Sequence, residues 1–437
     1  MRYRMTVIGS GYLGITHAAC MAELGHEVLA LDIDADRIRR LGAGQLPIHE
    51  AGLEALLRRG LDSGKLRFTT SYQEAAEFGD VHFLCLGTPQ QQGAYAADVS
   101  QLDAAVGALA PHLGRECLVV GKSTVPVGTA ERLAGALRRL APAGDRVDLA
   151  WNPEFLREGF AVKDTLGPDR IVLGLRTASA EKVLREVYAP LGDVPFVVTD
   201  FATAELVKVA ANSFLATKIS YINAMAEVCE AAGADVVRLA EALSYDDRIG
   251  GRFLRPGLGF GGGCLPKDIR AFMARADELG AGPALSFLRE VDAVNLRRRD
   301  RTVDLARDLA GGSFAGRRVT VLGAAFKPDS DDIRDSPALH VAAEIQRQGG
   351  RVSVYDPVAL DNARKACPEL SYATSATEAA RGAHVLLLLT EWREFVRLDP
   401  AELGAVVAVR HVLDGRHALD PARWRQAGWR YRAPGRP

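Results

Sequence analysis

Over the first 200 residues, short runs of apolar, often β-branched residues alternate with longer stretches whose apolar positions recur at helical spacing. The apolar runs predict strands at residues 5–8, 27–32, 81–85, 117–122 and 147–151, with helices between them. Strands that alternate with helices form parallel sheets, and their right-handed connections place ligands at the carboxyl ends of the strands. Residues 1–200 are therefore predicted to form a doubly wound α/β domain.

The pattern changes near Asp200. Residues 203–232 contain neither proline nor glycine and predict a single helix about 45 Å long, which ends at Gly233. A helix of this length needs packing partners, so we expect it to form a layer shared between two copies of the chain. Further helical sequence at residues 234–243 and 267–309 completes a predicted central helical domain of residues 201–312.

A glycine pair and a serine, residues 311–313, predict a joint before a second α/β domain of residues 313–437. Its predicted strands are residues 317–323, 351–355 and 383–389. This domain is not a detectable sequence repeat of the first one. The last residues, 432–437, are expected to be a frayed tail.

Composition restricts the possible functions. The 437 residues are 48% hydrophobic and 25% charged with a net charge of -1, so no overall positive field favours nucleic acid or an anionic membrane. We expect no signal peptide and no membrane span. The six cysteines form no CxxC pair and no metal-ligand cluster with histidine, so we expect free thiols, a cytoplasmic protein and no metal site.

The strongest chemical signal is GSGYLG, residues 9–14, between the first strand and the first helix. Gly9 permits a tight turn, Gly11 lets the backbone approach a pyrophosphate, and Gly14 allows close packing of helix on strand. The N-terminus of the helix favours phosphate binding. Asp32 ends the next strand, where a carboxylate accepts hydrogen bonds from a ribose and repels a 2′-phosphate. The segment predicts NAD binding in preference to NADP.

A second signal is RPGLGFGGGCLPKD, residues 255–268. Its glycines allow the chain to wrap closely around a ligand, and Pro266 fits the first turn of a following helix. Cys264 then lies just before a helix N-terminus, where partial positive charge favours the thiolate. We therefore expect Cys264 to be a nucleophile, whereas Cys20, Cys85, Cys117 and Cys229 are expected to be small buried apolar residues.

Four further segments carry weaker signals. In ELVKVAAN, residues 205–212, Lys208 and Asn212 share one helix face, although an exposed lysine on a helix rim is the commoner arrangement. KSTVPVGT (residues 122–129) and NPEFLREG (residues 152–159) follow predicted strands, and a capped helix start or a charged surface turn explains each equally well. FKPDSDDIRDSP, residues 326–337, is by composition a charged loop.

Taken in their order along the chain, these six segments resemble the UDP-glucose/GDP-mannose dehydrogenase family over nearly the whole sequence. The resemblance implies two Rossmann-like doubly wound domains joined by a central helical domain with one long helix. It also implies a four-electron oxidation of a nucleotide-sugar alcohol to a carboxylate with two molecules of NAD, through a thiohemiacetal and a thioester on Cys264. The base of the first step stays open between Lys208 and a water held by Thr124 and Asp268.

The resemblance also implies a role for each matching residue. Catalysis is assigned to Cys264, Lys208, Asn212, Asp268, Thr124 and Glu154. NAD contacts are assigned to Gly9, Gly11, Gly14, Asp32, Arg37, Thr88, Thr124, Glu158 and Arg334. Nucleotide-sugar contacts are assigned to Glu154, Phe155, Leu156, Lys208, Asn212, Arg248, Arg255, Gly257, Gly259, Phe260, Gly261, Lys327 and Arg416. Arg248 would reach in from a neighbouring subunit, which implies at least a homodimer.

Within the family, two segments favour UDP-glucose. NPEFLREG differs from the arginine-containing version of this motif in N-acetylhexosamine relatives, and GPDRIVLG, residues 167–174, is more similar to the UDP-glucose branch than to the GDP-mannose branch. Phe260 and Gly263 depart from the Tyr and Ser of many members, which leaves the chemistry intact but weakens the sugar assignment. Two other functions stay open: a two-electron hydroxy-acid dehydrogenase, which needs no nucleophilic cysteine, and a non-catalytic dinucleotide-binding scaffold.

Overall fold

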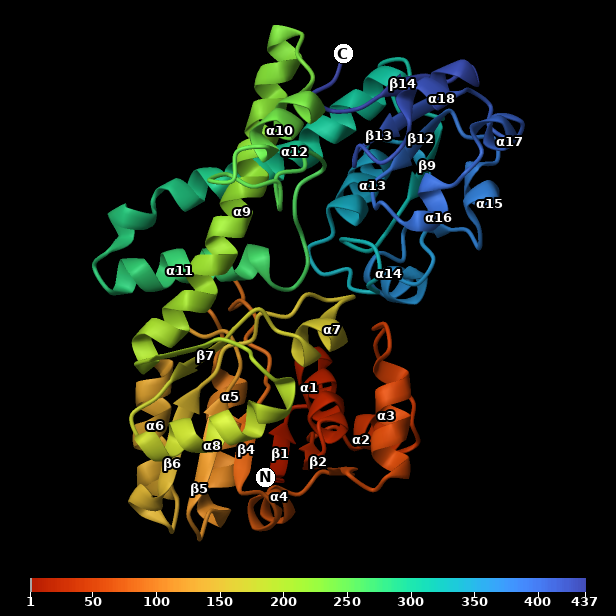
Figure 1. Ribbon diagram of the computed structural model, residues 1–437. Helices are drawn as coiled ribbons and strands as arrows, with labels where there is room; N and C mark the ends of the chain where they lie inside the picture. The colour runs from red at the N-terminus through yellow and green to blue at the C-terminus, as the bar shows by residue number, and fades with distance from the viewer. Residues whose placement is uncertain (1) are drawn as a thin grey trace. The chain divides into compact units, whose positions relative to one another are not determined.

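The computed structural model describes residues 2–437 and contains two sheets flanked by helices (Figure 1). Most of the buried apolar side chains lie between these sheets and their helices. The chain divides into two units. The first comprises the chain up to Ala211 together with Arg270–Leu279, and the second comprises Asn212–Ile269 and Gly280–Pro437. No helix among residues 2–437 is long and apolar enough to cross a membrane.

The first sheet has eight strands in the order β3-β2-β1-β4-β5-β6-β7-β8, parallel except where β6 meets β7. The five predicted strands are confirmed to within one residue at each end, and three short strands were not predicted. The strands are β1 (Arg4–Ile8), β2 (Glu27–Leu31), β3 (Leu66–Thr69), β4 (Val81–Leu84), β5 (Cys117–Gly121), β6 (Val147–Trp151), β7 (Ile171–Gly174) and β8 (Phe196–Thr199).

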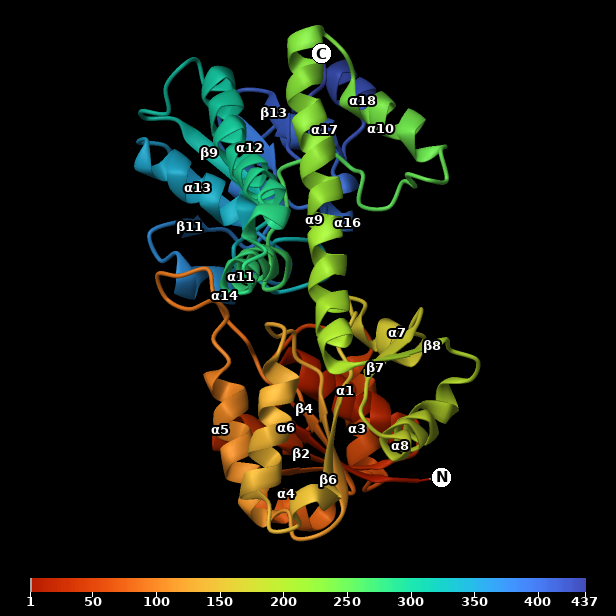
Figure 2. The same ribbon diagram turned by 90° about the vertical axis from the view of Figure 1, so that its left-hand side faces the viewer.

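Helices cover both faces of this sheet, because successive strand residues point alternately to opposite sides. One buried cluster joins the sheet to α1, α3 and α8, and another joins it to α4, α5 and α6 (Figure 2). The helices are α1 (Tyr12–Glu23), α2 (Ala35–Gly42), α3 (Leu53–Asp62), α4 (Tyr72–Phe78), α5 (Ser100–Leu109), α6 (Thr129–Leu140), α7 (Ala161–Leu166) and α8 (Ala178–Tyr188), with short 3-10 turns Ala110–His112, Gly144–Arg146 and Ala189–Leu191.

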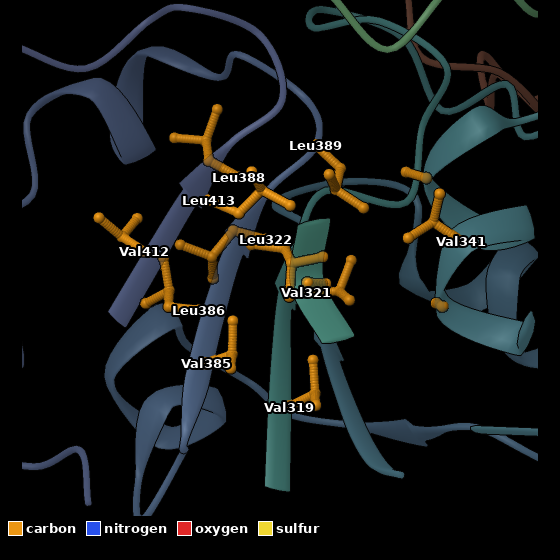
Figure 3. Close-up of a cluster of buried hydrophobic side chains, with 14 of the residues drawn as sticks. Val319, Val321, Leu322, Val341, Val385, Leu386, Leu388, Leu389, Val412 and Leu413 are labelled. Carbon is orange, nitrogen blue, oxygen red and sulfur yellow. The ribbon is translucent and has the colours of Figure 1, made fainter. Parts of the chain in front are cut away.

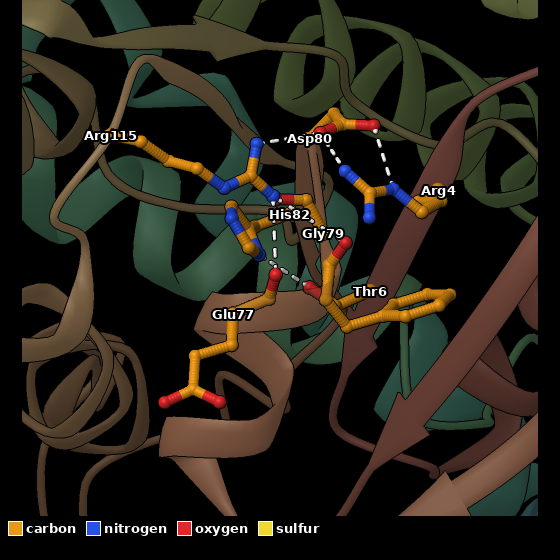
Figure 4. Close-up of polar contacts among 8 residues, drawn as sticks. Arg4, Thr6, Glu77, Gly79, Asp80, His82 and Arg115 are labelled. Atoms are coloured by element: carbon orange, nitrogen blue, oxygen red, sulfur yellow. Dashed lines mark hydrogen bonds and ion pairs between the residues drawn. The ribbon is translucent and has the colours of Figure 1, made fainter.

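A polar cluster ties together the amino-terminal ends of β1, β4 and β5 (Figure 4). Asp80 pairs with Arg4 at 3.1 Å and with Arg115 at 2.6 Å, and Thr6 Oγ1 lies 2.7 Å from Nδ1 of buried His82. Burial lowers the pKa of His82 to about 4. The cluster lies at the amino-terminal ends of these strands, whereas the glycine motif follows the carboxyl-terminal end of β1. We therefore assign the cluster a structural role.

The long helix is confirmed as α9 (Phe201–Ala232) (Figure 2). It is followed by α10 (Val236–Ser244), α11 (Leu265–Glu278), the 3-10 turn Gly282–Leu285 and α12 (Phe287–Leu309). The prediction of continuous helical sequence over residues 267–309 was wrong, because Gly280, with φ +75°, Gly282 and Pro283 end one helix before the next begins.

The second sheet has six parallel strands in the order β11-β10-β9-β12-β13-β14, around a core rich in valine and leucine (Figure 3). Its strands are β9 (Arg318–Leu322), β10 (Arg351–Tyr355), β11 (Ser371–Tyr372), β12 (Val385–Leu388), β13 (His411–Asp414) and β14 (Arg430–Arg432). Its helices are α13 (Pro337–Arg347), α14 (Leu360–Ala366), α15 (Ala376–Ala380), α16 (Arg393–Val396), α17 (Pro400–Gly404) and α18 (Pro421–Gln426).

Both sheets begin with the same strand order, in which the third, second and first strands precede the fourth, fifth and sixth. This is the Rossmann arrangement, which places ligands where the strand order reverses. The two Rossmann-like domains and the helical segment confirm the predicted fold class.

The prediction of a frayed tail was wrong. Arg432 ends strand β14, and the segment after it is bonded to α9 and α10: Gly435 N–H donates to Glu230 at 2.8 Å, and Arg436 pairs with Asp235 at 3.0 Å.

Candidate active site

The turn between β1 and α1 has the form that a pyrophosphate site needs. Gly9 has φ +92°, and a Cβ there would lie 2.7 Å from the carbonyl oxygen of Cys85, while a Cβ on Gly14 would overlap Gly9 O. Gly11, directly before α1, has no atom within 4 Å of the position of a Cβ. Gly9 and Gly14 therefore allow tight packing, and Gly11 leaves the helix N-terminus open to an anion.

Asp32, directly after β2, is placed to bind a ribose. Its carboxylate accepts from Ser10 N–H at 2.8 Å and Asp34 N–H at 3.0 Å, and it pairs with Arg37 at 3.0 Å. These three bonds leave acceptor capacity on an ionised carboxylate, which has about four lone-pair sites. This residue and the glycine turn fit a dinucleotide with a free 2′-hydroxyl.

The second sheet has an aspartate at the same place, Asp356 directly after β10, but this residue has no such capacity. It is fully buried and accepts hydrogen bonds from five donors, which are Ala324 N, Ala325 N, Val358 N, Ala359 N and Trp392 Nε1. All of its acceptor sites are taken by the protein. The dinucleotide is therefore expected at the first sheet and not at the second.

Two loops at the carboxyl ends of β4 and β5 are joined by side-chain hydrogen bonds. Thr88 Oγ1 donates to Thr124 O at 2.7 Å, and Ser123 Oγ both donates to Leu86 O at 2.6 Å and accepts from Leu86 N–H. Thr88 and Thr124, both predicted site residues, are thus held next to each other.

Lys208 and Glu154 form a buried ion pair. Lys208 Nζ lies 3.0 Å from Glu154 Oε1, and the two side chains are 6% and 12% exposed. Glu154 also accepts from Leu156 N–H at 2.8 Å, and Lys208 lies 5.4 Å from the ring of Phe155, which Arg170 covers at 3.8 Å. The structure therefore places this lysine against the NPEFLREG segment and not on a solvated helix rim.

A second buried polar cluster includes the first residues of two motifs, Lys122 and Asn152, which the sequence analysis did not single out. Lys122 Nζ donates to Asn152 Oδ1 at 2.9 Å, Tyr188 OH donates to the same oxygen at 2.6 Å, and Asn152 Nδ2 donates to Val172 O at 2.9 Å. Burial lowers the pKa of Lys122 to about 8. The cluster joins β5, β6, β7 and α8, so it fixes the loops that carry Thr124 and Glu154.

The end of the KSTVPVGT segment is held by two further residues. Glu205, three residues before Lys208 on α9, accepts from Gly128 N–H and Ala130 N–H, each at 2.7 Å, at the start of α6. Arg275 on α11 donates to Val127 O at 2.9 Å. Glu205 was present in the quoted motif but not singled out, and its only sequence signal is an acidic residue on the apolar face of a helix.

Glu158 is buried in the loop before α7, next to a second carboxylate that anchors this loop. Glu50 accepts from Gly159 N–H at 2.7 Å and Ala161 N–H at 2.8 Å, and the hydroxyl of Tyr12, from the glycine motif, donates to Glu50. The NPEFLREG segment is therefore tied to the start of the dinucleotide-binding helix.

In the second unit, the buried carboxylate of Asp268 bonds to Asn212, and its backbone N–H bonds to Cys264. Asp268 is 2% exposed, accepts from Asn212 Nδ2 at 2.6 Å and pairs with Lys267 at 2.6 Å. Asp268 N–H donates to Cys264 O at 3.0 Å, so Cys264 is the residue directly before the first turn of α11. Helix α9 carries Asn212 one turn after Lys208.

The exposure of the cysteines separates one from the rest. Cys264 is exposed, Cys367 is partly exposed, and Cys20, Cys85, Cys117 and Cys229 are buried as predicted. Burial raises the pKa of Cys20 and of Cys85 to about 12, which keeps both as unreactive thiols. An exposed thiol at a helix N-terminus is the arrangement that favours a nucleophile.

The remaining predicted residues lie around the glycine-rich loop or on the surface of the second unit. Arg416 donates to Gly259 O at 3.0 Å and Phe326 O at 3.1 Å, so it joins the loop to the segment that contains Lys327. The Arg334 guanidinium lies against Gly263, where a Cβ would overlap it. Arg248 is 89% exposed and pairs with Asp246, and Arg255 is exposed.

The buried carboxyl of Glu205 predicts a pH dependence of stability. Burial raises its pKa from 4.5 to about 7, although two backbone donors oppose the shift. The folded protein therefore keeps a proton that the unfolded chain has released, so the stability from Glu205 is greatest below pH 4.5 and is lost as the pH rises to about 7. In Glu205→Gln we expect this loss, on the order of 1–3 kcal/mol, to disappear.

Urea unfolding at about pH 5 and about pH 8 measures this difference. Glu181→Gln controls for the loss of a carboxylate, because Glu181 pairs with Arg185 on the surface of α8. The difference between the pH profiles of Glu205→Gln and Glu181→Gln is attributed to Glu205. Identical pH profiles for the wild type and Glu205→Gln would contradict the prediction.

Three domain models of the UDP-glucose/GDP-mannose dehydrogenase family match the chain: the NAD binding domain at residues 3–192, the central domain at residues 202–297 and the UDP binding domain at residues 320–421. A UDP-glucose 6-dehydrogenase of Rhizobium meliloti is 40% identical, over 99% of this chain and 100% of that protein.

Solved structures give the same relationship. A UDP-glucose dehydrogenase from the archaeon Pyrobaculum islandicum has a TM-score of 0.92 and 37% identity, covering 100% of this chain and 98% of that one. A UDP-D-ManNAc dehydrogenase from Pyrococcus horikoshii has a TM-score of 0.87 and 26% identity, covering 100% and 99%. By sequence over its whole length and by fold, this chain belongs to the UDP-glucose/GDP-mannose dehydrogenase family.

Proposed function

We propose that this protein oxidises UDP-glucose to UDP-glucuronate with two molecules of NAD, through a covalent intermediate on Cys264. The observation that carries the proposal is that Cys264 is exposed directly before α11 and next to buried Asp268, within the glycine-rich loop. A two-electron hydroxy-acid dehydrogenase needs no such thiol, and a non-catalytic scaffold needs neither the thiol nor the buried Lys208–Glu154 pair.

NAD would be held by Gly9, Gly11, Gly14 and Asp32. Its further contacts would be Arg37, Thr88, Thr124, Glu158 and Arg334. When bound, NAD accepts a hydride from C6 of the sugar in each of the two oxidations. The open N-terminus of α1 and the remaining acceptor capacity of Asp32 support this assignment.

In the first oxidation, the C6 hydroxyl must lose a proton. Lys208 would accept it directly, or a water held by Thr124 and Asp268 would carry it. The pair with Glu154 holds Lys208 Nζ in a buried position, from which it would also donate to the sugar oxygen.

In the second oxidation, the Cys264 thiolate attacks the aldehyde carbon and forms a thiohemiacetal. Loss of the second hydride leaves a thioester, and water hydrolyses it to the carboxylate and regenerates the thiol. Lys208 and Asn212 would stabilise the oxyanions, and Glu154 and Thr124 would hold the attacking water.

The substrate assignment rests on the family and on relatives. The UDP binding domain model matches residues 320–421, and relatives at 37% and 40% identity are named UDP-glucose dehydrogenase and UDP-glucose 6-dehydrogenase. The nucleotide-sugar would be bound by Phe155 and Leu156, by the loop with Arg255, Gly257, Gly259, Phe260 and Gly261, and by the side chains of Lys327 and Arg416. Six free cysteines support a reducing compartment, and we propose the cytoplasm.

We also propose that the chain acts as a homodimer or larger oligomer, with Arg248 completing the site of a neighbouring subunit. Three apolar residues of α9, Phe214, Tyr221 and Val228, follow one another at seven-residue intervals and are 66%, 51% and 57% exposed. This spacing places them along one side of the helix. A row of exposed apolar residues supports burial against a second copy.

The overall reaction is tested by counting reduced cofactor. Purified protein with excess NAD and limiting UDP-glucose is expected to form two NADH per sugar, measured by absorbance, because the thioester commits the aldehyde to the second oxidation. One NADH per sugar would contradict the covalent half of the proposal. Reduction with GDP-mannose but not with UDP-glucose would overturn the substrate.

The nucleophile is tested with Cys264→Ser. We expect turnover to fall on the order of a hundredfold or more, with binding of both ligands retained, because a serine ester forms and hydrolyses more slowly than a thioester. Cys367→Ser, at a partly exposed cysteine outside the site, is the matched control and should turn over normally. Normal turnover by Cys264→Ser would remove the covalent role.

The oligomer is tested by light scattering. We expect at least twice the chain mass of 46.9 kDa for the wild type and a shift toward the single-chain mass for Tyr221→Glu, because a charge would be buried in the contact. Phe287→Glu, at an apolar residue of α12 that is 50% exposed, is the control and should not dissociate. A monomeric wild type would contradict the proposal.

A further inference from the structure

The buried part of the glycine-rich loop that follows Arg255 is bonded by side chains. Two helices supply most of them, and Arg416, after β13, donates to Gly259 O. Residues 257–260 lie outside every helix and strand, so their peptide groups have no partner in secondary structure. These residues are nevertheless buried, and a buried peptide group without a partner is strongly unfavourable. Some other group must therefore bond to them.

Asn295 of α12 bonds to both the backbone N–H and the backbone C=O of Phe260. Its Oδ1 accepts from Phe260 N–H at 2.7 Å, and its Nδ2 donates to Phe260 O at 3.0 Å. The carboxamide thus replaces the two bonds that a neighbouring strand would make. Asn295 is 1% exposed, and a Cβ on Gly259, which has φ +97°, would lie 2.5 Å from Asn295 Oδ1. Glycine at position 259 allows the close approach.

Gly257 is held on both sides in the same way. Asn223 of α9, which is fully buried, accepts from Gly257 N–H through Oδ1 at 2.8 Å. Arg298 of α12, also fully buried, donates from Nε toward Gly257 O at 3.4 Å. Three buried polar side chains thus fix the path of the loop from two helices.

We propose that Asn295 and Asn223 are positioning residues, which hold the glycine-rich loop in the conformation that receives the nucleotide-sugar. The inference rests on the proposed function, because that function gives the loop its ligand. Neither residue needs to touch the substrate: each acts through a peptide group of the loop. Preorganisation of this kind lowers the ordering cost of binding, so its loss weakens the affinity for the ligand.

The loop conformation is tested first, in the full-length protein without ligand. Amide hydrogen exchange at single-residue resolution should show protected Phe260 and Gly257 amides in the wild type. In Asn295→Ala we expect the Phe260 amide to exchange at least about tenfold faster, and in Asn223→Ala the Gly257 amide, because each loses its acceptor. The two variants are independent, so one of them tests the inference if the other does not fold.

The matched control is Ser220→Ala. Ser220 is a buried residue of α9 whose hydroxyl donates to Val291 O of α12 at 2.7 Å, between the same two helices but away from the loop. Its removal should lower the unfolding midpoint by an amount comparable with the asparagine variants and leave both loop amides protected.

Ligand binding is measured on the same proteins with UDP and NAD by calorimetry, and with UDP-glucose by initial rates. In Asn295→Ala and Asn223→Ala we expect the Kd for UDP and the KM for UDP-glucose to rise about tenfold, with the Kd for NAD unchanged. Ser220→Ala should bind UDP as the wild type does.

The inference would be overturned by an asparagine variant whose loop amides exchange faster but whose Kd for UDP equals the wild-type value. It would also be overturned if the Kd for UDP rose as much in Ser220→Ala as in the asparagine variants. A wild type that fails to bind UDP would instead overturn the proposed substrate. The two failures are therefore distinguished by which protein shows them.

Discussion

Backbone N–H and C=O groups in the loops after β5 and β6, and in the glycine-rich loop between α10 and α11, have no partners in a helix or a ladder. Buried groups of this kind must still be bonded. The structure meets this requirement with side chains. Glu205 bonds to the start of α6, Glu50 to the start of α7, and Asn295 to Phe260. The same loops carry the residues assigned to chemistry, so the groups that satisfy the backbone also fix the candidate site.

The two Rossmann-like sheets show how one topology serves two purposes. Each has an aspartate directly after its second strand, but Asp32 keeps free acceptor capacity whereas Asp356 is fully bonded inside the protein. The fold alone would allow a dinucleotide at either sheet. The local hydrogen bonds leave the first sheet as the one equipped to bind a ribose, and this agrees with the family assignment of NAD and UDP binding domains.

Charge and burial divide the polar residues of the candidate site in a similar way. Lys122 and Glu205 are buried, and burial moves the pKa of each toward neutrality, yet they bond to protein groups such as Asn152 Oδ1 and Gly128 N–H. A pKa shifted by burial therefore belongs here to residues that support the site, and such a shift does not by itself identify a catalytic group. Cys264 is distinguished instead by its exposure and by its place before α11.

Local periodicity and short motifs were enough to predict the α/β class, the long helix, the glycine turn with Asp32 and the place of Cys264 directly before a helix. They did not reveal the short strands β3, β7, β8, β11, β13 and β14, the break between α11 and α12 or the docked C-terminal tail. The polar residues that support the loops could be recognised only in the folded chain. Lys122 and Glu205 begin two of the motifs, and Asn223 and Asn295 lie outside all of them. No local pattern marks their role, because each bonds to a group that lies from 30 to 77 residues away along the chain.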